Sequence, residues 1–233
     1  MKLTQLTNRD AVRQNPRTMG GADVNLWRSA DHALEYLAKA DTIPRRSEGE
    51  RTLLEFLPAT VARVLDLGSG DGRLLSLIRL ARPEASGVAC DFSPVMLDRL
   101  RARFAGDSAI DVIAHDLDQP LPASLGDFDV IVSSFAIHHL TDPRKRALYG
   151  EIFERLRPGG VFLNLEHVAS PTPALHLAFL GALGVAAPDE DPSNKLLDTG
   201  RQLEWLREIG FADVDCHWKW RELALIGGVA PAR

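Results

Sequence analysis

The ten residues 64–73, with the sequence VLDLGSGDGR, restrict the possible folds of this chain more than any other stretch. An apolar strand runs directly into a loop with glycine at alternate positions, and a helix is expected from Leu74 onward. Glycine lacks a Cβ atom and tolerates positive φ, so the backbone of such a loop can approach a ligand closely. The free N–H groups of the following helix favour an anionic group beside them. The stretch therefore predicts a binding loop for a small charged cofactor.

The overall composition is that of an ordinary globular protein. The 233 residues suffice for one large domain, alone or with an accessory segment, and 45% of them are hydrophobic. The net charge is −5 without a long basic run, which disfavours a nucleic-acid substrate. The N-terminus has no long apolar run, and the two cysteines, Cys90 and Cys216, are expected to be free thiols. We therefore expect no signal peptide, no membrane span and a cytoplasmic location.

Apolar strand-like runs alternate with helical patterns through most of the chain. Five strands are expected at residues 62–67, 86–90, 110–114, 128–134 and 161–165. The helical segments between them predict a parallel sheet, because parallel neighbours need crossover connections. Two further strands, at 212–220 and 223–226, are joined by two residues, which permits only an antiparallel hairpin. The expected fold class is α/β: a doubly wound, mostly parallel, seven-stranded Rossmann-like sheet with a C-terminal antiparallel hairpin.

Two helix starts have recognisable capping residues. Ser47, with Glu50 three positions later, has the arrangement of a capping box and predicts a helix over 47–57. Ser93 followed by Pro94 predicts an N-cap and the first position of another helix.

Two segments lie outside the alternation of strands and helices. Residues 1–46 read as a polar arm followed by a lid helix, with a helical pattern over 27–38. Residues 171–196 contain a small apolar stretch and an acidic patch, and are expected to form an insert that caps the substrate. Residues 47–233 would then form the main domain, including this insert.

Four of the first five expected strands end in polar residues. These residues are Asp66, Asp91, Asp116, Ser133 and Ser134. In open α/β sheets the ligand crevice lies beyond the carboxyl ends of the strands. The spacing of Asp91 from Gly72 suits a carboxylate that binds two ribose hydroxyls. Each aspartate alone is also compatible with a helix cap or a strand end, but together, in this order, they favour a ligand site.

Several motifs follow one another in a fixed order along the chain. They are VLDLGSGDG, the acid Asp91 after the second strand, His115-Asp116-Leu117 after the third, FDVIVSSFAIHHL at 128–140 and LRPGG at 156–160. Together they resemble the class I S-adenosylmethionine-dependent methyltransferases. The resemblance covers residues 45–168 closely and the final hairpin loosely. It implies S-adenosylmethionine as cofactor and S-adenosylhomocysteine as product, and it leaves the methyl acceptor open.

The resemblance assigns a role to each residue of the cofactor site. The residues that it places at the methionine end are Asp66, Gly68, Ser69, Gly70, Ser133 and Ser134. Among these, Asp66 would support the amino group, and a backbone carbonyl of Ser133 or Ser134 would accept from the ammonium. The residues that it places at the nucleoside end are Asp91, Phe92, Asp116 and Leu117. Asp91 would bind the ribose hydroxyls, and Asp116 would accept from the adenine amino group.

Polar residues after the fourth and fifth strands are candidates for a general base, which is needed where the acceptor loses a proton during attack. They are His138, His139, Glu166 and His167. His139 is the strongest, because paired histidines at this point recur in similar methyltransferases that act on small molecules. Trp27 and Tyr36, with His139, are expected to contact the substrate under a lid that excludes water. No metal site is expected, because the histidines and cysteines lack ligand spacing.

The interpretation that unites these features is an enzyme that transfers a sulfonium methyl group to O, N or C of a small molecule by in-line displacement. It would act as a monomer or homodimer. One alternative is an NAD-dependent oxidoreductase, disfavoured because Gly72 comes one position early and Arg73 occupies the position of the third fingerprint glycine. The other alternative is a non-catalytic S-adenosylmethionine-binding regulatory protein.

Overall fold

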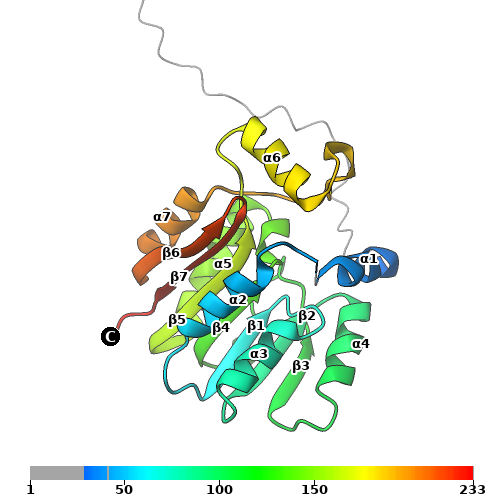
Figure 1. Cartoon of the computed structure of the whole chain (residues 1–233). Helices are drawn as coiled ribbons and strands as arrows, with labels where there is room; N and C mark the ends of the chain where they lie inside the picture. The colour runs from blue at the N-terminus through cyan, green and yellow to red at the C-terminus, as the bar shows by residue number, and fades with distance from the viewer. Residues whose placement is uncertain (1–28, 41, 233) are drawn as a thin grey trace, which may run out of the picture.

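A seven-stranded sheet between two layers of helices forms the body of the protein; the computed structural model describes residues 29–40 and 42–232 (Figure 1). The strands are β1 (Arg63–Leu67), β2 (Ser86–Asp91), β3 (Ile110–Ala114), β4 (Phe128–Ser134), β5 (Leu156–His167), β6 (Ala212–Trp220) and β7 (Leu223–Val229). Their order is β3-β2-β1-β4-β5-β7-β6, and β7 is antiparallel to both of its neighbours. The other pairs are parallel, so the predicted fold class is confirmed.

Two hydrophobic cores lie on opposite faces of the sheet. The helices are α1 (Ala30–Ala40), α2 (Arg46–Glu55), α3 (Arg73–Ala81), α4 (Pro94–Arg103), α5 (Asp142–Arg155), α6 (Pro173–Leu183) and α7 (Thr199–Ile209). One core contains side chains of α2, α3 and α4, and the other those of α5 and α7. Val64 and Leu65 of β1 enter different cores, because successive strand residues point to opposite faces. In the described part of the chain, every helix is too short or too polar to cross a lipid bilayer.

The predicted capping box at the start of α2 is wrong. The helix begins at Arg46, and its N-cap is Arg45, which has φ 65° and no side-chain capping bond. Glu50 is buried, and its carboxylate accepts from Arg46 Nε at 2.8 Å instead of turning back to an N-cap amide. The Glu50 carboxylate therefore binds the Arg46 guanidinium in a buried position and does not form the capping box predicted from the sequence.

The start of α4 lies where it was predicted, although the capping group differs. Ser93 is the N-cap and Pro94 the first helical residue, but the Ser93 side chain makes no capping bond. The Ser93 N–H donates to Asp91 Oδ1 at 2.9 Å. The carboxylate at the end of β2 thus binds the chain where it turns into the helix.

The insert at 171–196 contains α6 and the short 3-10 helix η4 (Ala187–Asp189). In Figure 1, α6 lies beyond one end of the sheet, outside the two helical layers. Phe179 and Leu180 attach it to the core formed with α2, α3 and α4, whereas Leu175 and Leu177 are more than half exposed. The sheet and its two helical layers are complete without this segment.

Gly227 on β7 lies so close to β5 that a methyl group does not fit. A Cβ atom there would lie 2.3 Å from the carbonyl oxygen of Phe162. We expect Gly227→Ala to lower the free energy of unfolding by roughly 2 kcal/mol, because β5 and β7 must move apart to accommodate the added methyl group. The measurement is urea denaturation. As a control, Gly150→Ala in α5 has no atom within 4 Å of the added Cβ and should stabilise by about 0.5–1 kcal/mol. Unchanged stability of Gly227→Ala would contradict the close approach of the two strands.

Candidate functional site

A cleft with an empty volume of about 1060 Å³ is lined by residues that follow β1, β2, β3 and β4. The predicted site residues that line it are Tyr36, Asp66, Gly68, Ser69, Gly70, Asp91, Phe92, Asp116, Leu117, Ser134 and His139. Ser133, His138 and Glu166 are buried and do not line the cleft. Trp27 lies outside the described residues. The structure therefore brings together most of the residues that were singled out from distant parts of the chain.

Hydrogen bonds tie the glycine-rich loop to β2. Ser69 Oγ donates to the carbonyl of Asp66 at 2.7 Å and accepts from the N–H of Cys90 at 2.9 Å. The Ser69 N–H donates to the Cys90 carbonyl at 2.9 Å, and the Gly70 N–H donates to Asp91 Oδ2 at 2.9 Å. These four bonds span the ends of β1 and β2. They fix the loop backbone at the edge of the cleft.

Two glycines of the loop are required for different reasons. Gly68 has φ +66°, and a Cβ there would lie 2.3 Å from the Cβ of Ala136 in the loop after β4. Gly70 has φ +58° but has open space where a side chain would be. Gly68 thus permits close packing of two loops, while Gly70 keeps the cleft open in a conformation that disfavours other residues.

Asp66 is a buried carboxyl without a matching partner. It is 1% exposed, and neither of its oxygens forms a hydrogen bond within the described residues. Burial raises its pKa to about 7, an effect only partly offset by the nearby Ser69 hydroxyl and Leu75 N–H. A buried anion without a partner is costly, so the site favours either a proton or a cationic group from a ligand. The cleft therefore has a place suited to an ammonium group.

The carboxylate of Asp91 is held by the backbone. Its two oxygens accept from Gly70 N–H and Ser93 N–H, each at 2.9 Å. Burial raises the pKa of Asp91, and the hydrogen bonds from the backbone oppose this shift. Phe92 lines the cleft beside it. The carboxylate is thus fixed in orientation at the predicted nucleoside end.

Asp116 and Leu117 line the cleft in the loop after β3. Asp116 Oδ1 accepts from the Asp118 N–H at 3.0 Å, which shapes a local turn. The carbonyl of Leu117 accepts from Arg144 Nε at 2.6 Å. These bonds connect the loop to α5 and hold it beside the cleft.

Sequence reasoning missed a cluster of two arginines around Glu50. Arg46 Nε and Arg73 Nε each lie 2.8 Å from Glu50 Oε1, and Arg73 Nη2 lies 2.9 Å from Oε2. Both arginines line the cleft, and the Arg46 guanidinium lies 5.4 Å from the ring centroid of Phe135. The two guanidiniums bind the buried carboxylate and place positive charge along this wall of the cleft. The i,i+4 spacing of Arg46 and Glu50 was a signal that the capping-box interpretation obscured.

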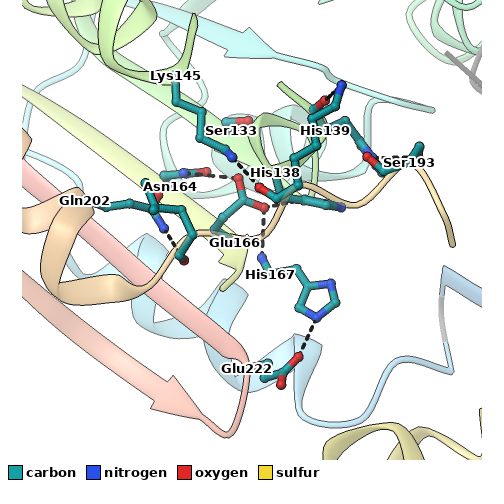
Figure 2. Close-up of polar contacts among 12 residues, drawn as sticks. Ser133, His138, His139, Lys145, Asn164, Glu166, His167, Ser193, Gln202 and Glu222 are labelled. Atoms are coloured by element: carbon teal, nitrogen blue, oxygen red, sulfur yellow. Dashed lines mark hydrogen bonds and ion pairs between the residues drawn. The ribbon is translucent and has the colours of Figure 1, made fainter. Parts of the chain in front are cut away.

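Three candidate bases form one cluster at the cleft, in which His138 and Glu166 are buried and His139 is half-buried (Figure 2). His138 Nδ1 lies 2.5 Å from Glu166 Oε1, and the rings of His138 and His139 are 3.9 Å apart between centroids. Burial lowers the pKa of both histidines well below 6.5, and burial raises the pKa of Glu166. His139 is the one of the three that lines the cleft. His167 binds Glu222 at 2.9 Å on the side away from Glu166 (Figure 2).

Comparison with known proteins identifies the family to which this arrangement belongs. The family described as "Methyltransferase domain" matches residues 64–160, which include the glycine-rich loop and the strand ends around the cleft. A demethylmenaquinone methyltransferase of Clavibacter sepedonicus is 30% identical over 173 residues, covering 68% of this chain and 69% of that protein. This chain belongs to the class I S-adenosylmethionine-dependent methyltransferases. S-adenosylmethionine is accordingly its cofactor, and the oxidoreductase alternative is set aside.

Solved structures agree with this methyltransferase fold. An O-methyltransferase family protein from Burkholderia thailandensis superposes with a TM-score of 0.70 at 20% identity, over 88% of this chain and 62% of that one. Human N-acetylserotonin methyltransferase, solved in complex with S-adenosylmethionine, gives 0.64 at 19% identity, over 89% and 58%. The methyltransferase chain thus spans less than two thirds of either protein.

Asp66 makes the stability of this methyltransferase depend on pH. Its folded pKa of about 7 lies above the ordinary value of 3.8, so ionisation of the buried carboxyl destabilises the fold. Without ligand, the wild type should lose up to about 4 kcal/mol of unfolding free energy, relative to Asp66→Asn, as the pH rises from 4 to 7. Urea denaturation at several pH values measures this difference. A difference between the two proteins that stays constant from pH 4 to 8 would contradict an unpartnered Asp66.

Proposed function

We propose that this methyltransferase acts on a small molecule with an acidic hydroxyl, a phenol or an enol, and that His139 is the general base. When bound, S-adenosylmethionine supplies a sulfonium methyl group as the electrophile. The observation that carries the proposal is the position of His139, which lines the same cleft as Asp66 and Asp91. The methyl group would go to the acceptor oxygen or to a conjugated carbon, because loss of the hydroxyl proton makes both atoms nucleophilic.

The residues around the cleft fit the chemical groups of the cofactor. Asp66 offers an unpartnered carboxylate to the ammonium, and a backbone carbonyl of Ser134 at the end of β4 would add to it. Ser133 is fully buried, and its hydroxyl donates to the carbonyl of Leu67, so we favour Ser134 of the two. The arginine pair, Arg46 and Arg73, would attract the methionine carboxylate. This set would orient the methionine end, with the open backbone of the Gly68, Ser69 and Gly70 loop beside it.

The nucleoside end would lie along the loops after β2 and β3. Asp91 is fixed by two backbone N–H groups and would accept from the ribose hydroxyls. Phe92 and Leu117 would pack against the adenine, and Asp116 would accept from its amino group.

The chemistry of His139 supports an acceptor with an acidic hydroxyl. Burial lowers the pKa of His139, so the imidazole is neutral at pH 7 and can accept a proton. A base weakened in this way takes a proton most readily from a group that is itself acidic. Phenols and enols meet this condition better than aliphatic alcohols do.

His138 and Glu166 would act through His139 and would not touch the acceptor. Both are buried, and their hydrogen bond of 2.5 Å fixes the ring that stacks against His139. We therefore propose that they hold the base in place, a narrower role than the catalytic one predicted from the sequence.

We also propose that two segments cover the acceptor. Tyr36 of α1 lines the cleft, so α1 would serve as a lid helix, whereas Trp27, the other aromatic residue predicted for this lid, lies outside the described residues. The insert at 171–196 contacts the histidine cluster, since the Lys195 N–H donates to the His138 carbonyl at 2.9 Å. Residues 47–233 would be the methyltransferase domain, with this insert as its cap.

An assay with labelled cofactor tests the proposal. The purified protein is incubated with S-adenosylmethionine carrying a radiolabelled methyl group and, separately, with 1,4-dihydroxynaphthalene, acetylacetone, catechol or benzylamine. Labelled product from a hydroxyl compound and none from benzylamine is the expected result. Preferential methylation of benzylamine would contradict the acceptor class. Measurable cofactor binding without product, from these compounds or from a metabolite extract, would favour a non-catalytic regulatory protein.

Replacing Asp91 tests the ribose assignment. Asp91→Ala should weaken the affinity for S-adenosylmethionine by about 10- to 100-fold, because hydrogen bonds to a charged acceptor are lost. Calorimetric titration measures the change. Asp98→Ala on the exposed face of α4 removes a carboxylate that pairs with Arg101 and should leave the affinity unchanged. Equal affinities of Asp91→Ala and the wild type would remove Asp91 from the cofactor site.

Replacing His139 tests the base. His139→Gln should lower kcat by about 100-fold or more, because the imidazole that takes the proton from the acceptor is lost, while cofactor affinity changes less than about threefold. The control is His217→Gln on β6, where the histidine stacks on Phe56. Wild-type turnover by His139→Gln would show that the reaction needs no base at this position.

A further inference from the structure

We propose that Asp191 and Ser193 of the insert are positioning residues that fix the tautomer of His139. They hold its Nδ1 as the protonated nitrogen, which leaves the lone pair on Nε2. The proposal rests on the proposed function only in taking His139 as the base.

A short hydrogen-bonded chain connects the three residues. Ser193 Oγ lies 3.0 Å from His139 Nδ1 and donates to Asp191 Oδ1 at 2.7 Å. The Ser193 N–H donates to the same carboxylate oxygen at 2.8 Å. The side chain of Ser193 is drawn toward that of His139 in Figure 2. The carboxylate therefore fixes both the backbone and the hydroxyl of the residue that faces the imidazole.

The partners of Nδ1 determine which nitrogen carries the proton. The Ser193 hydroxyl has one hydrogen, and its bond to Asp191 uses that hydrogen, so toward His139 the oxygen is an acceptor. The carbonyl oxygen of Ser193, which only accepts, lies 3.4 Å from the same Nδ1. Two acceptors beside Nδ1 require it to donate. The neutral ring must then have its lone pair on Nε2.

The insert is anchored so that this geometry persists. Lys195 donates its N–H to the His138 carbonyl at 2.9 Å, and its Nζ lies 3.1 Å from the His139 carbonyl. These contacts hold residues 191–195 against the 3-10 turn η3 (Ile137–His139). A segment outside the sheet thereby supplies the orientation of the base.

The first helix also reaches this chain of contacts. His32 Nε2 of α1 lies 3.3 Å from Asp191 Oδ2, the oxygen that does not bind Ser193. Although burial opposes it, hydrogen bonds from Ser193 and the nearby His139 and His32 lower the pKa of Asp191, so it is ionised at neutral pH. Both proposed covering segments thus meet at the carboxylate that orients the base.

The charges around His139 predict the direction of its titration when Asp191 is changed. The titratable groups near it are His138 on the same turn, Glu166 on β5, Lys145 on α5, Asp191 and Lys195 on the insert, and His32 on α1. Burial and His138 lower the pKa of His139, whereas Asp191, Glu166 and the Ser193 carbonyl raise it. Loss of the Asp191 charge should therefore lower it further.

Nitrogen-15 NMR of histidine-labelled protein tests the proposal without any acceptor. In the wild type, the His139 signals should be those of the Nδ1–H tautomer. Asp191→Asn and Ser193→Ala should each raise the population of the Nε2–H form. Asp191→Asn should also shift the titration of His139 downward by about one pH unit. An Nε2–H tautomer in the wild type, or an unchanged tautomer in both variants, would overturn the proposal.

Matched variants separate positioning from folding. Ser193→Thr keeps the hydroxyl and should keep the wild-type tautomer, and Asp189→Asn changes an exposed acid of the same insert without altering His139. Should Asp191→Asn prove poorly folded, the contrast between Ser193→Ala and Ser193→Thr decides alone. Equal tautomer populations in these two serine variants would then count against the proposal.

Turnover of 1,4-dihydroxynaphthalene adds a second readout. Ser193→Ala should lower kcat about tenfold or more with cofactor affinity unchanged, because a mixed tautomer presents the basic nitrogen less often. A changed tautomer with unchanged kcat would overturn the positioning role. If His139→Gln has the turnover of the wild type, His139 is not the general base. The NMR result still shows whether Asp191 and Ser193 determine the tautomer of its imidazole.

Discussion

The attachment of the glycine-rich loop to β2 is the constraint on which the site depends. The Ser69 hydroxyl bridges Asp66 and Cys90, and the Gly70 N–H binds Asp91, so the ends of β1 and β2 are locked together. Because Gly68 packs against Ala136, the same loop also sets the position of the segment after β4. That segment leads directly into the turn with His139. One loop thereby relates the cofactor side of the cleft to the proposed base.

Three buried carboxyl groups near the cleft differ in the partners that the fold provides for them. Glu50 is bound by two guanidiniums, and Asp91 accepts from two backbone N–H groups. Asp66 has neither, and burial raises its pKa to about 7. Asp66 therefore favours the binding of a cationic ligand, because the ligand supplies the positive charge that the fold does not place beside this carboxylate. An ammonium group at Asp66 would supply the missing positive charge, in line with the proposed binding of the methionine end there.

Local sequence patterns were sufficient to predict the sheet. They could not predict contacts that form between distant parts of the chain, such as the cluster around Glu50. Strand runs and the two-residue link at Arg221 and Glu222 were enough for the topology class, because apolar periodicity and loop length act locally. Asp66 and Asp91, which the resemblance singled out, both line the cleft. The Glu50 cluster was missed because its partner Arg73 lies on another helix, and a capping motif competed for the same residues.

The orientation of the two histidines at the proposed acceptor site also could not be predicted from the sequence. His138 and His139 are adjacent in sequence, yet one is buried against Glu166 and the other lines the cleft. Nothing in their spacing distinguishes them, because η3 and the insert decide the direction of each ring. The contact between Ser193 and His139 joins residues far apart in the chain, and the insert carries no strand or core pattern that would predict it.

Proton linkage tests most directly whether the cleft is built around Asp66. Binding of S-adenosylmethionine at pH 7 is measured by calorimetry in buffers of different ionisation enthalpy, for the wild type and for Asp66→Asn. If the ammonium displaces the proton of a half-protonated Asp66, the wild type should release about half a proton more than the variant. Equal proton release by the two proteins, together with equal affinity, would contradict the account.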